Sequence, residues 1–142
     1  MTLTLEGANE ITNRRNAAMM RGDVDAFLDL WDEACVVEGP EHYLEGKEEL
    51  GTSIKAAFAA MKVVLMTTRS MAVQADVLFY EWTIVWEVRA SGERMLFTGM
   101  THHRVSDAGK LLHCREYFDP SGSVRKTVLL DAAVAAASRR AE

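Results

Sequence analysis

The spacing of apolar positions along the chain changes near residue 62 and separates a helical part from a strand part. Before that point apolar residues recur every three or four positions, the period of an amphipathic helix. After it they alternate with polar residues, the period of a strand with one buried face. The predicted helices span residues 8–21, 24–33 and 47–61, with a short strand at 34–38, and the predicted long strands span 63–73, 77–89, 94–105 and 110–119.

Short turn sequences join the predicted long strands, at 74–76, 90–93 and 106–109. Turns of this length pair consecutive strands antiparallel. Helices grouped ahead of such a meander predict an α+β fold, with the helices on one face of a mainly antiparallel sheet. The 142 residues are enough for one domain with a hydrophobic core, and residues 126–142 are expected to add a C-terminal helical extension to it.

The last predicted strand places a carboxylate on an apolar face. Alternation sets its side chains on two faces, Leu112, Cys114, Glu116 and Phe118 on one and Leu111, His113, Arg115, Tyr117 and Asp119 on the other. A lone carboxylate among apolar neighbours costs stability unless a partner or a function compensates it. Glu116 is therefore the first candidate for a general acid or base. A structural ion pair with a buried arginine is the competing interpretation.

Two further residues are candidates to assist Glu116. Arg15 falls on the apolar stripe of the first helix, four positions after Ile11, where it could orient Glu116 or bind an anionic substrate group. Extension of its side chain to the surface is the alternative. Alternation with Phe97 places His103 on the inner face of its strand, where a pair with Glu116 is possible, although a satisfied core histidine is also consistent.

Aromatic residues dominate the inner faces of the long strands. Trp82, Trp86, Tyr80 and Phe97 would together form the wall of an apolar pocket for a flat or polycyclic ligand, whereas each alone is consistent with core packing. Gly39-Pro40 breaks the short strand, and residues 41–46, which include His42 and Tyr43, are expected to form a surface loop. The residues predicted to contact the substrate are Trp82, Ile84, Trp86, Phe97, Gly99, Thr101, Phe118, Glu38 and Tyr43.

Composition excludes several functional classes. The net charge of −5 argues against a nucleic-acid partner, and no apolar run approaches the length of a membrane span. The first residues lack the basic and apolar regions of a signal peptide, so a cytoplasmic location is expected. Cys35 and Cys114 are expected to be reduced and buried, and the histidines show no zinc-type spacing, so neither a metal nor an organic cofactor is expected.

The order of the predicted elements resembles the nuclear transport factor 2-like superfamily, which includes ketosteroid isomerases, limonene epoxide hydrolases and SnoaL-like polyketide cyclases. The resemblance implies a cone-shaped α+β barrel, in which a curved sheet and the helices enclose a pocket. It also implies that Glu38, His42 and Tyr43 lie at the mouth of that pocket. Homodimers through the sheet are common in that superfamily, and the apolar residues on the predicted outer face support the same expectation here. The stretches that carry the resemblance are 21–27, 37–40 before 46–48, and 109–111 leading to 115–119.

The resemblance also implies which catalytic positions are kept. The base and the two oxyanion-hole residues of ketosteroid isomerases fall at Gly39, Arg15 and near Thr101, so that mechanism is rejected. Two polar positions of limonene epoxide hydrolases fall at Trp82 and Ile84. The last-strand aspartate of those hydrolases, and the acid/base aspartate of SnoaL-like cyclases, fall at Glu116.

The sequence therefore predicts a small enzyme that uses Glu116 on a hydrophobic, polycyclic or polyketide-like molecule. The reaction class would be cyclisation, isomerisation, hydration or epoxide opening. The alternative is a non-catalytic binding protein for a hydrophobic small molecule, in which Glu116 and Arg15 form a structural or ligand-orienting pair. The replacement of so many polar catalytic positions favours that alternative.

Overall fold

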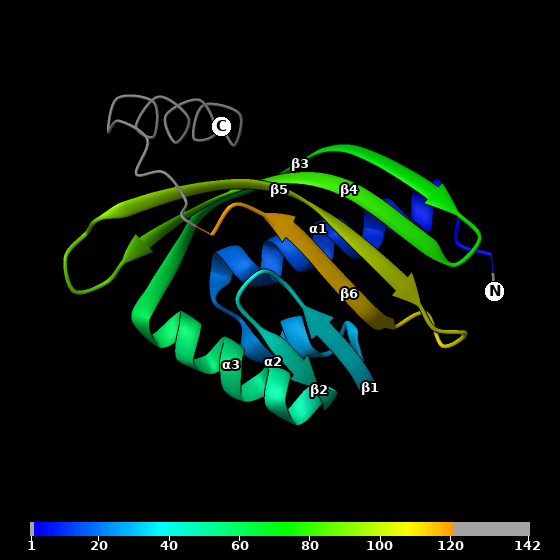
Figure 1. Cartoon of the computed structure of the whole chain (residues 1–142), viewed down its shortest axis with the longest axis horizontal. Helices are drawn as coiled ribbons and strands as arrows, with labels where there is room; N and C mark the ends of the chain where they lie inside the picture. Colours follow the sequence, from blue (N-terminus) through cyan, green and yellow to red (C-terminus); the bar gives the residue numbers. More distant parts are fainter. Residues whose placement is uncertain (1, 121–142) are drawn as a thin grey trace.

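A six-stranded mixed sheet curves over three helices in the computed structural model, which describes residues 2–120 (Figure 1). The strand order is β2-β1-β6-β5-β4-β3, in which only β1 and β6 pair in parallel. The predicted α+β fold is confirmed. The elements are α1 (Leu5–Arg21), α2 (Val24–Leu28), β1 (Trp31–Glu38), β2 (Tyr43–Glu45), α3 (Gly46–Ala60), β3 (Met61–Gln74), β4 (Val77–Val88), β5 (Arg94–Val105) and β6 (Leu111–Phe118).

Local capping signals fix the first two helices. The Thr4 hydroxyl accepts a hydrogen bond from the backbone N–H of Gly7 at 3.1 Å and starts α1. Gly22 ends α1 with a left-handed φ of 63°, and the Asp23 carboxylate caps α2 by accepting from the Ala26 N–H at 3.0 Å. Each cap satisfies backbone groups that a helix end leaves without intrahelical partners.

The second helix is shorter than its apolar spacing predicts. The pattern predicts a helix to residue 33, but α2 ends at Leu28, and Trp31 already pairs with Leu111 in β1. The Leu111 N–H donates to the Leu30 carbonyl at 2.8 Å. Pairing with a strand distant in sequence therefore overrides the local helical period. The expected loop at residues 41–46 likewise contains the short strand β2, which pairs with β1.

A β-bulge shifts the faces of β6. The β5–β6 register moves from Arg104 opposite His113 to Val105 opposite Leu111, which leaves Leu112 as an extra residue. Leu111, which alternation places on the outer face, is therefore completely buried. Cys114, Glu116 and Phe118 keep the inner face that alternation predicts, because they lie beyond the bulge.

The outer face of the sheet carries apolar side chains that are exposed in the single chain. Phe79, Met100 and Tyr117 are all exposed, and they come from the neighbouring strands β4, β5 and β6. The homodimer expected through this face stays a prediction. The predicted C-terminal helix lies outside the described residues.

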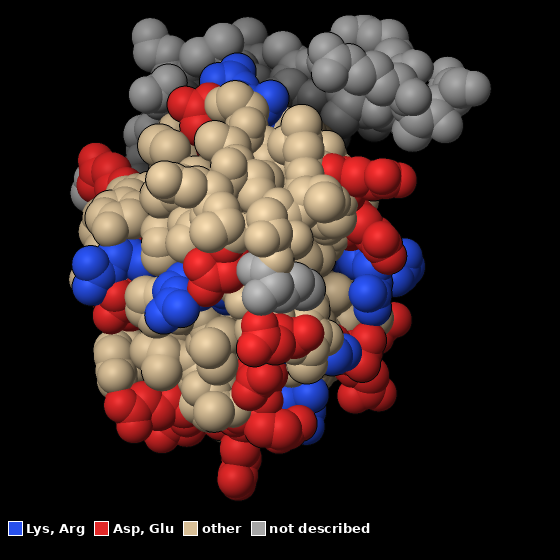
Figure 2. Space-filling view, turned by 90° about the vertical axis from the view of Figure 1, so that its right-hand side faces the viewer, with Lys and Arg blue, Asp and Glu red and all other residues tan. Residues whose placement is uncertain are grey.

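Charge is distributed unevenly over the surface. Figure 2 shows acidic side chains gathered on the lower part of one end of the molecule, where α3 and β2 lie in Figure 1. Glu45 belongs to β2, and Glu48 and Glu49 belong to α3. Among the described residues, no helix is long and apolar enough to span a membrane.

Gly99 permits the close approach of β5, β6 and the Trp82 ring. A Cβ at this position would lie 2.5 Å from the Tyr117 carbonyl oxygen and 2.7 Å from Trp82 Cζ2. We expect Gly99→Ala to lower the free energy of unfolding by about 1–3 kcal/mol, the usual cost of overpacking, measured by urea denaturation. Gly7→Ala is the matched control: its Cβ would meet no atom closer than 3.4 Å, and alanine should stabilise the helix by about 0.5–1 kcal/mol. Equal effects of the two substitutions would contradict this account.

Candidate functional site

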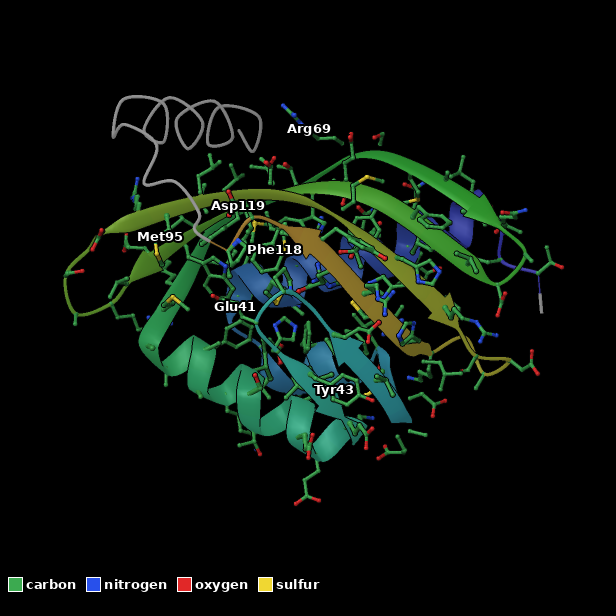
Figure 3. All side chains as sticks on the ribbon, in the orientation of Figure 1. Glu41, Tyr43, Arg69, Met95, Phe118 and Asp119 are labelled. Atoms are coloured by element: carbon green, nitrogen blue, oxygen red, sulfur yellow. The ribbon has the colours of Figure 1, made fainter. Side chains whose placement is uncertain are left out.

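A cavity of about 390 Å³ lies between the helices and the inner face of the sheet. Most of its lining is apolar, and five of the residues predicted to contact a substrate line it: Trp82, Ile84, Trp86, Phe97 and Phe118. Tyr80, which was predicted to belong to the aromatic wall, does not line it. Arg15 and Glu116 also line it. In Figure 3 the labelled Phe118, Met95 and Glu41 lie beneath the sheet, whereas Arg69 points away above it. Apolar cavities with a few polar groups are the usual form of small-molecule sites.

Within this cavity, Glu116 forms an ion pair with the buried Arg15. Its side chain is 18% exposed, and Arg15 Nη2 donates to Glu116 Oε1 at 3.4 Å. On the other carboxylate oxygen, His42 Nε2 lies 3.7 Å from Glu116 Oε2, beyond hydrogen-bond length but close enough for electrostatic interaction. The carboxylate is thus bracketed by a cation on the buried side and an imidazole on the side of the mouth.

Arg15 is held deep in the molecule, as its place on the apolar stripe of α1 predicts. Its side chain is 7% exposed, and Nη1 lies 3.8 Å from Met66 Sδ. Burial lowers the pKa of Arg15, but the nearby acidic groups of Tyr80, Glu116 and Cys114 outweigh burial and raise it. The guanidinium therefore keeps its charge inside the protein and faces Glu116 instead of extending to the surface.

His42 lies closer to Glu116 than the sequence pattern predicts. The Gly39 N–H donates to the His42 carbonyl at 2.9 Å and closes a turn that folds the imidazole back over Gly39. A Cβ at Gly39 would lie 2.6 Å from His42 Cε1, so only glycine leaves room for the ring there. The Gly39-Pro40 break signals a turn, but nothing in the pattern shows that the turn returns His42 to Glu116.

His103 is buried on the inner side, as alternation predicts, but it does not meet Glu116. Its Nε2 shares a hydrogen bond of 3.2 Å with the Tyr80 hydroxyl, and its ring packs edge-on against Trp31. Thr101 is equally buried and accepts a hydrogen bond from Trp82 Nε1 at 2.7 Å. Burial raises the pKa of Tyr80 to about 12. These side chains form a polar layer behind the cavity wall.

Three other predicted contact residues lie away from the cavity lining. Glu38 accepts a hydrogen bond from Arg115 Nε, and this bond comes first among the causes that lower the Glu38 pKa. Tyr43 is 59% exposed and donates from its hydroxyl to Glu45 Oε1 at 2.7 Å. Gly99 serves the close strand packing described above. Of the three residues expected at the pocket mouth, only His42 lines the cavity, next to Glu41 and Pro120.

Residues 2–120 contain no group of three or more histidine, cysteine or acidic side chains that could hold a metal ion. Cys35 and Cys114 are both free thiols and buried, as the sequence predicts.

Comparison with known proteins identifies the family. Residues 13–113 match the SnoaL-like domain, so the chain belongs to that family, and this stretch ends three residues before Glu116. No curated protein matches the chain in sequence. Together with the solved structures below, the match supports the nuclear transport factor 2-like superfamily.

Solved structures with the same fold include enzymes of different reactions and a designed binding protein. A LEH-like epoxide hydrolase of M. tuberculosis is 16% identical, with a TM-score of 0.71 over 80% of this chain and 84% of that one. A Δ5-3-ketosteroid isomerase of Mycobacterium sp. is 17% identical, with a TM-score of 0.71 over 81% and 95%. A computationally designed 17-OHP binder is 19% identical, with a TM-score of 0.71 over 81% and 95%. At these identities the likeness concerns the fold alone.

The Arg15–Glu116 pair should show strong coupling in a double-mutant cycle. Arg15→Met leaves Glu116 without its cation, and loss of one partner of a buried pair typically costs about 3–5 kcal/mol. We expect the double variant Arg15→Met/Glu116→Gln to be more stable than Arg15→Met alone, because it removes the uncompensated charge. Chemical denaturation of the wild type, Arg15→Met, Glu116→Gln and the double variant measures the coupling free energy. Additive effects would show that the two side chains do not interact.

The burial of His103 predicts a pH dependence of stability. Burial, and next the charge of Arg15, lower the pKa of His103 well below its usual value of 6.5. The unfolded chain therefore binds a proton below that pH while the native ring stays neutral, and the free energy of unfolding falls by about 1.4 kcal/mol per pH unit. We expect His103→Gln to lose less stability than the wild type between about pH 6 and pH 4.5. Equal losses in denaturant titrations would contradict the prediction.

Proposed function

We propose that this protein is a small-molecule enzyme in which Glu116 acts as general acid/base on a hydrophobic substrate. The observation that carries the proposal is the position of Glu116: a largely buried carboxylate that lines an apolar cavity and contacts a buried guanidinium at 3.4 Å. A functional carboxylate in a cleft with a specific charge partner is a common arrangement of acid/base residues, although structural networks share it.

The surroundings of Glu116 suit the transfer of a proton. A carboxylate can take a proton from a bound substrate and return it elsewhere on the molecule, which serves isomerisation and cyclisation, or it can activate a water for hydration or epoxide opening. Arg15 supplies a fixed positive charge on the buried side, and His42 Nε2 lies 3.7 Å from the other oxygen on the side of the mouth, with its side chain 34% exposed. Trp82, Trp86 and the other aromatic side chains would hold a flat substrate against them.

A binding protein without catalysis is the second candidate. Trp82 and Ile84 stand where limonene epoxide hydrolases have polar catalytic residues. Thr101 accepts a hydrogen bond from Trp82 and does not line the cavity. Glu116 has a cation on one side, as a structural carboxylate would. The designed 17-OHP binder shares this fold, which supports the same alternative.

The substitution Glu116→Gln separates the two candidates. The amide keeps the size of the side chain and an acceptor for Arg15, but it cannot take up a proton at neutral pH. We expect the wild type to accelerate α-hydrogen exchange of 2-tetralone in D₂O, or hydrolysis of styrene oxide, and Glu116→Gln to lower that rate at least about 100-fold. NMR spectra of the products measure both reactions, and calorimetry tests whether the compounds still bind.

The matched control is Glu81→Gln, a carboxylate on the outer face of β4 that accepts a hydrogen bond from Ser70. It should leave the rate unchanged. Full activity in Glu116→Gln would refute the acid/base role. Tight binding of both compounds without any acceleration by the wild type would favour the binding protein.

A further inference from the structure

Burial on the outer face of β4 changes along the strand. Phe79 is 37% exposed, whereas Val85, further along on the same face, has no exposed surface. Leu65 pairs with Val85 from β3 and is 8% exposed. Ile84 and Trp86, on either side of Val85, line the cavity on the inner face, so the Val85 side chain points outward. One end of the outer face is therefore shielded from water.

The shielded side chains form a cluster that is separate from the core beneath the sheet. Leu65 and Val85 make up this outer cluster, with Val64 and Leu96 packed against them. A sheet face that is open to water normally leaves its side chains partly exposed. Figure 1 shows all three helices on the opposite side of the sheet. The described part of the chain thus supplies no helix that would cover Val85.

The described chain ends beside the outer cluster. Phe118, the last residue of β6, pairs with Gly99 of β5. Because the two strands are antiparallel, the chain that follows Phe118 runs along β5 in the direction of Leu96. Pro120 lines the cavity together with Phe97, which agrees with this direction. The part of the chain after Pro120 therefore begins at the border of the outer cluster.

Residues 121–142 are long enough to cross the outer cluster. Val85 and Leu65 lie on the second and third strands from β6, at distances of about 10 Å and 14 Å for the usual strand spacing. An extended chain covers such a distance in about three to five residues. A helix over 126–142 would measure about 25 Å, which exceeds the width of these strands.

The sequence of this segment favours packing against an apolar surface. Its apolar residues recur at the spacing of one helix face, at Val128, Leu129, Ala132 and Ala136. Asp131 is the only charged residue from Thr127 to Ser138. A helix that is apolar over most of its surface is normally buried, so this segment requires a partner surface of the kind that the outer cluster presents.

We propose that the segment after Pro120 packs across the outer face of its own sheet and covers the outer cluster. The exposures above belong to a single chain, so Val85 is buried without a second copy. The N-terminal residues lie elsewhere, because the Leu3 N–H donates to the Ala75 carbonyl in the turn between β3 and β4, at the other end of these strands. The proposal concerns the face opposite the cavity and does not depend on the proposed function.

The proposed cover divides the outer face into two parts. Phe79, Met100 and Tyr117 are exposed and lie beyond the outer cluster. A second copy that used this face would have to bind there, because the C-terminal segment would already occupy the rest. The segment would therefore set the limits of any contact between copies through the sheet.

Thiol labelling of the full chain tests the proposal. Val85→Cys introduces a thiol of similar size into the outer cluster, and Phe79→Cys places one on the exposed part of the same strand. An aromatic disulfide reagent should react at least about tenfold more slowly with Val85→Cys, because the reagent must wait for the cover to open. Cys35 and Cys114 are buried and should stay unreactive, which reports that each variant is folded.

Two double variants assign the cover to the C-terminal segment. Val128→Asn/Leu129→Asn places neutral polar groups on the apolar stripe of the segment, and it should speed the labelling of Val85→Cys at least about fivefold. Thr127→Asn/Ser138→Asn is the matched control, because it changes two positions that are already polar. It should leave the labelling rate of Val85→Cys unchanged.

Three results would overturn the proposal. Equal labelling rates of Val85→Cys and Phe79→Cys would show that the outer cluster is open to solvent. Protection that persists in Val128→Asn/Leu129→Asn would show that another part of the chain is the cover, and protection that rises with protein concentration would indicate a second copy. If Val85→Cys does not fold, the methyl NMR signals of Val85 and Leu65 decide: they should shift in Val128→Asn/Leu129→Asn, and unchanged signals would contradict the proposal.

Discussion

The contact between Arg15 and Glu116 is the constraint on which the interior of this protein depends. It joins α1 to β6 across the apolar cavity, and each side chain would be costly to bury without the other. The remaining polar groups are arranged around this pair. Tyr80 is hydrogen-bonded to His103, Thr101 accepts a hydrogen bond from Trp82, and His42 lies at the mouth. The cavity can therefore be largely apolar and still keep one charged centre.

Burial divides the polar groups of the cavity into two kinds. Arg15 and Trp31 are donors held away from water, whereas His42 and Glu41 lie at the mouth. Glu116 lies between them, with an exposure between those of Arg15 and His42. The guanidinium, the carboxylate and the imidazole thus form a series from the interior toward the mouth.

Periodicity predicted the parts of the fold that depend on local spacing. The long strands, the first and third helices and the burial of Arg15, Glu116 and His103 follow from it, since one face of each element is apolar. It failed where distant pairing decides. Trp31 belongs to β1 because Leu111 pairs with it, and Leu111 is buried because of a bulge that alternation cannot show. The position of His42 beside Glu116 was not predicted for a related reason: it depends on a turn that folds the imidazole back over Gly39, where a Cβ would meet the ring.

The pairing of β6 with β1 has a consequence for how the protein is made. Arg15 and Glu116 are separated by 101 residues, and β6 is the last described strand, so it must join both β1 and β5 before the two charges can meet. Contacts between residues so distant in sequence form slowly, because the chain must first lose the entropy of closing a long loop. During synthesis Arg15 leaves the ribosome long before Glu116 does. The same pair that marks the cavity therefore depends on the two ends of the described chain coming together through β6.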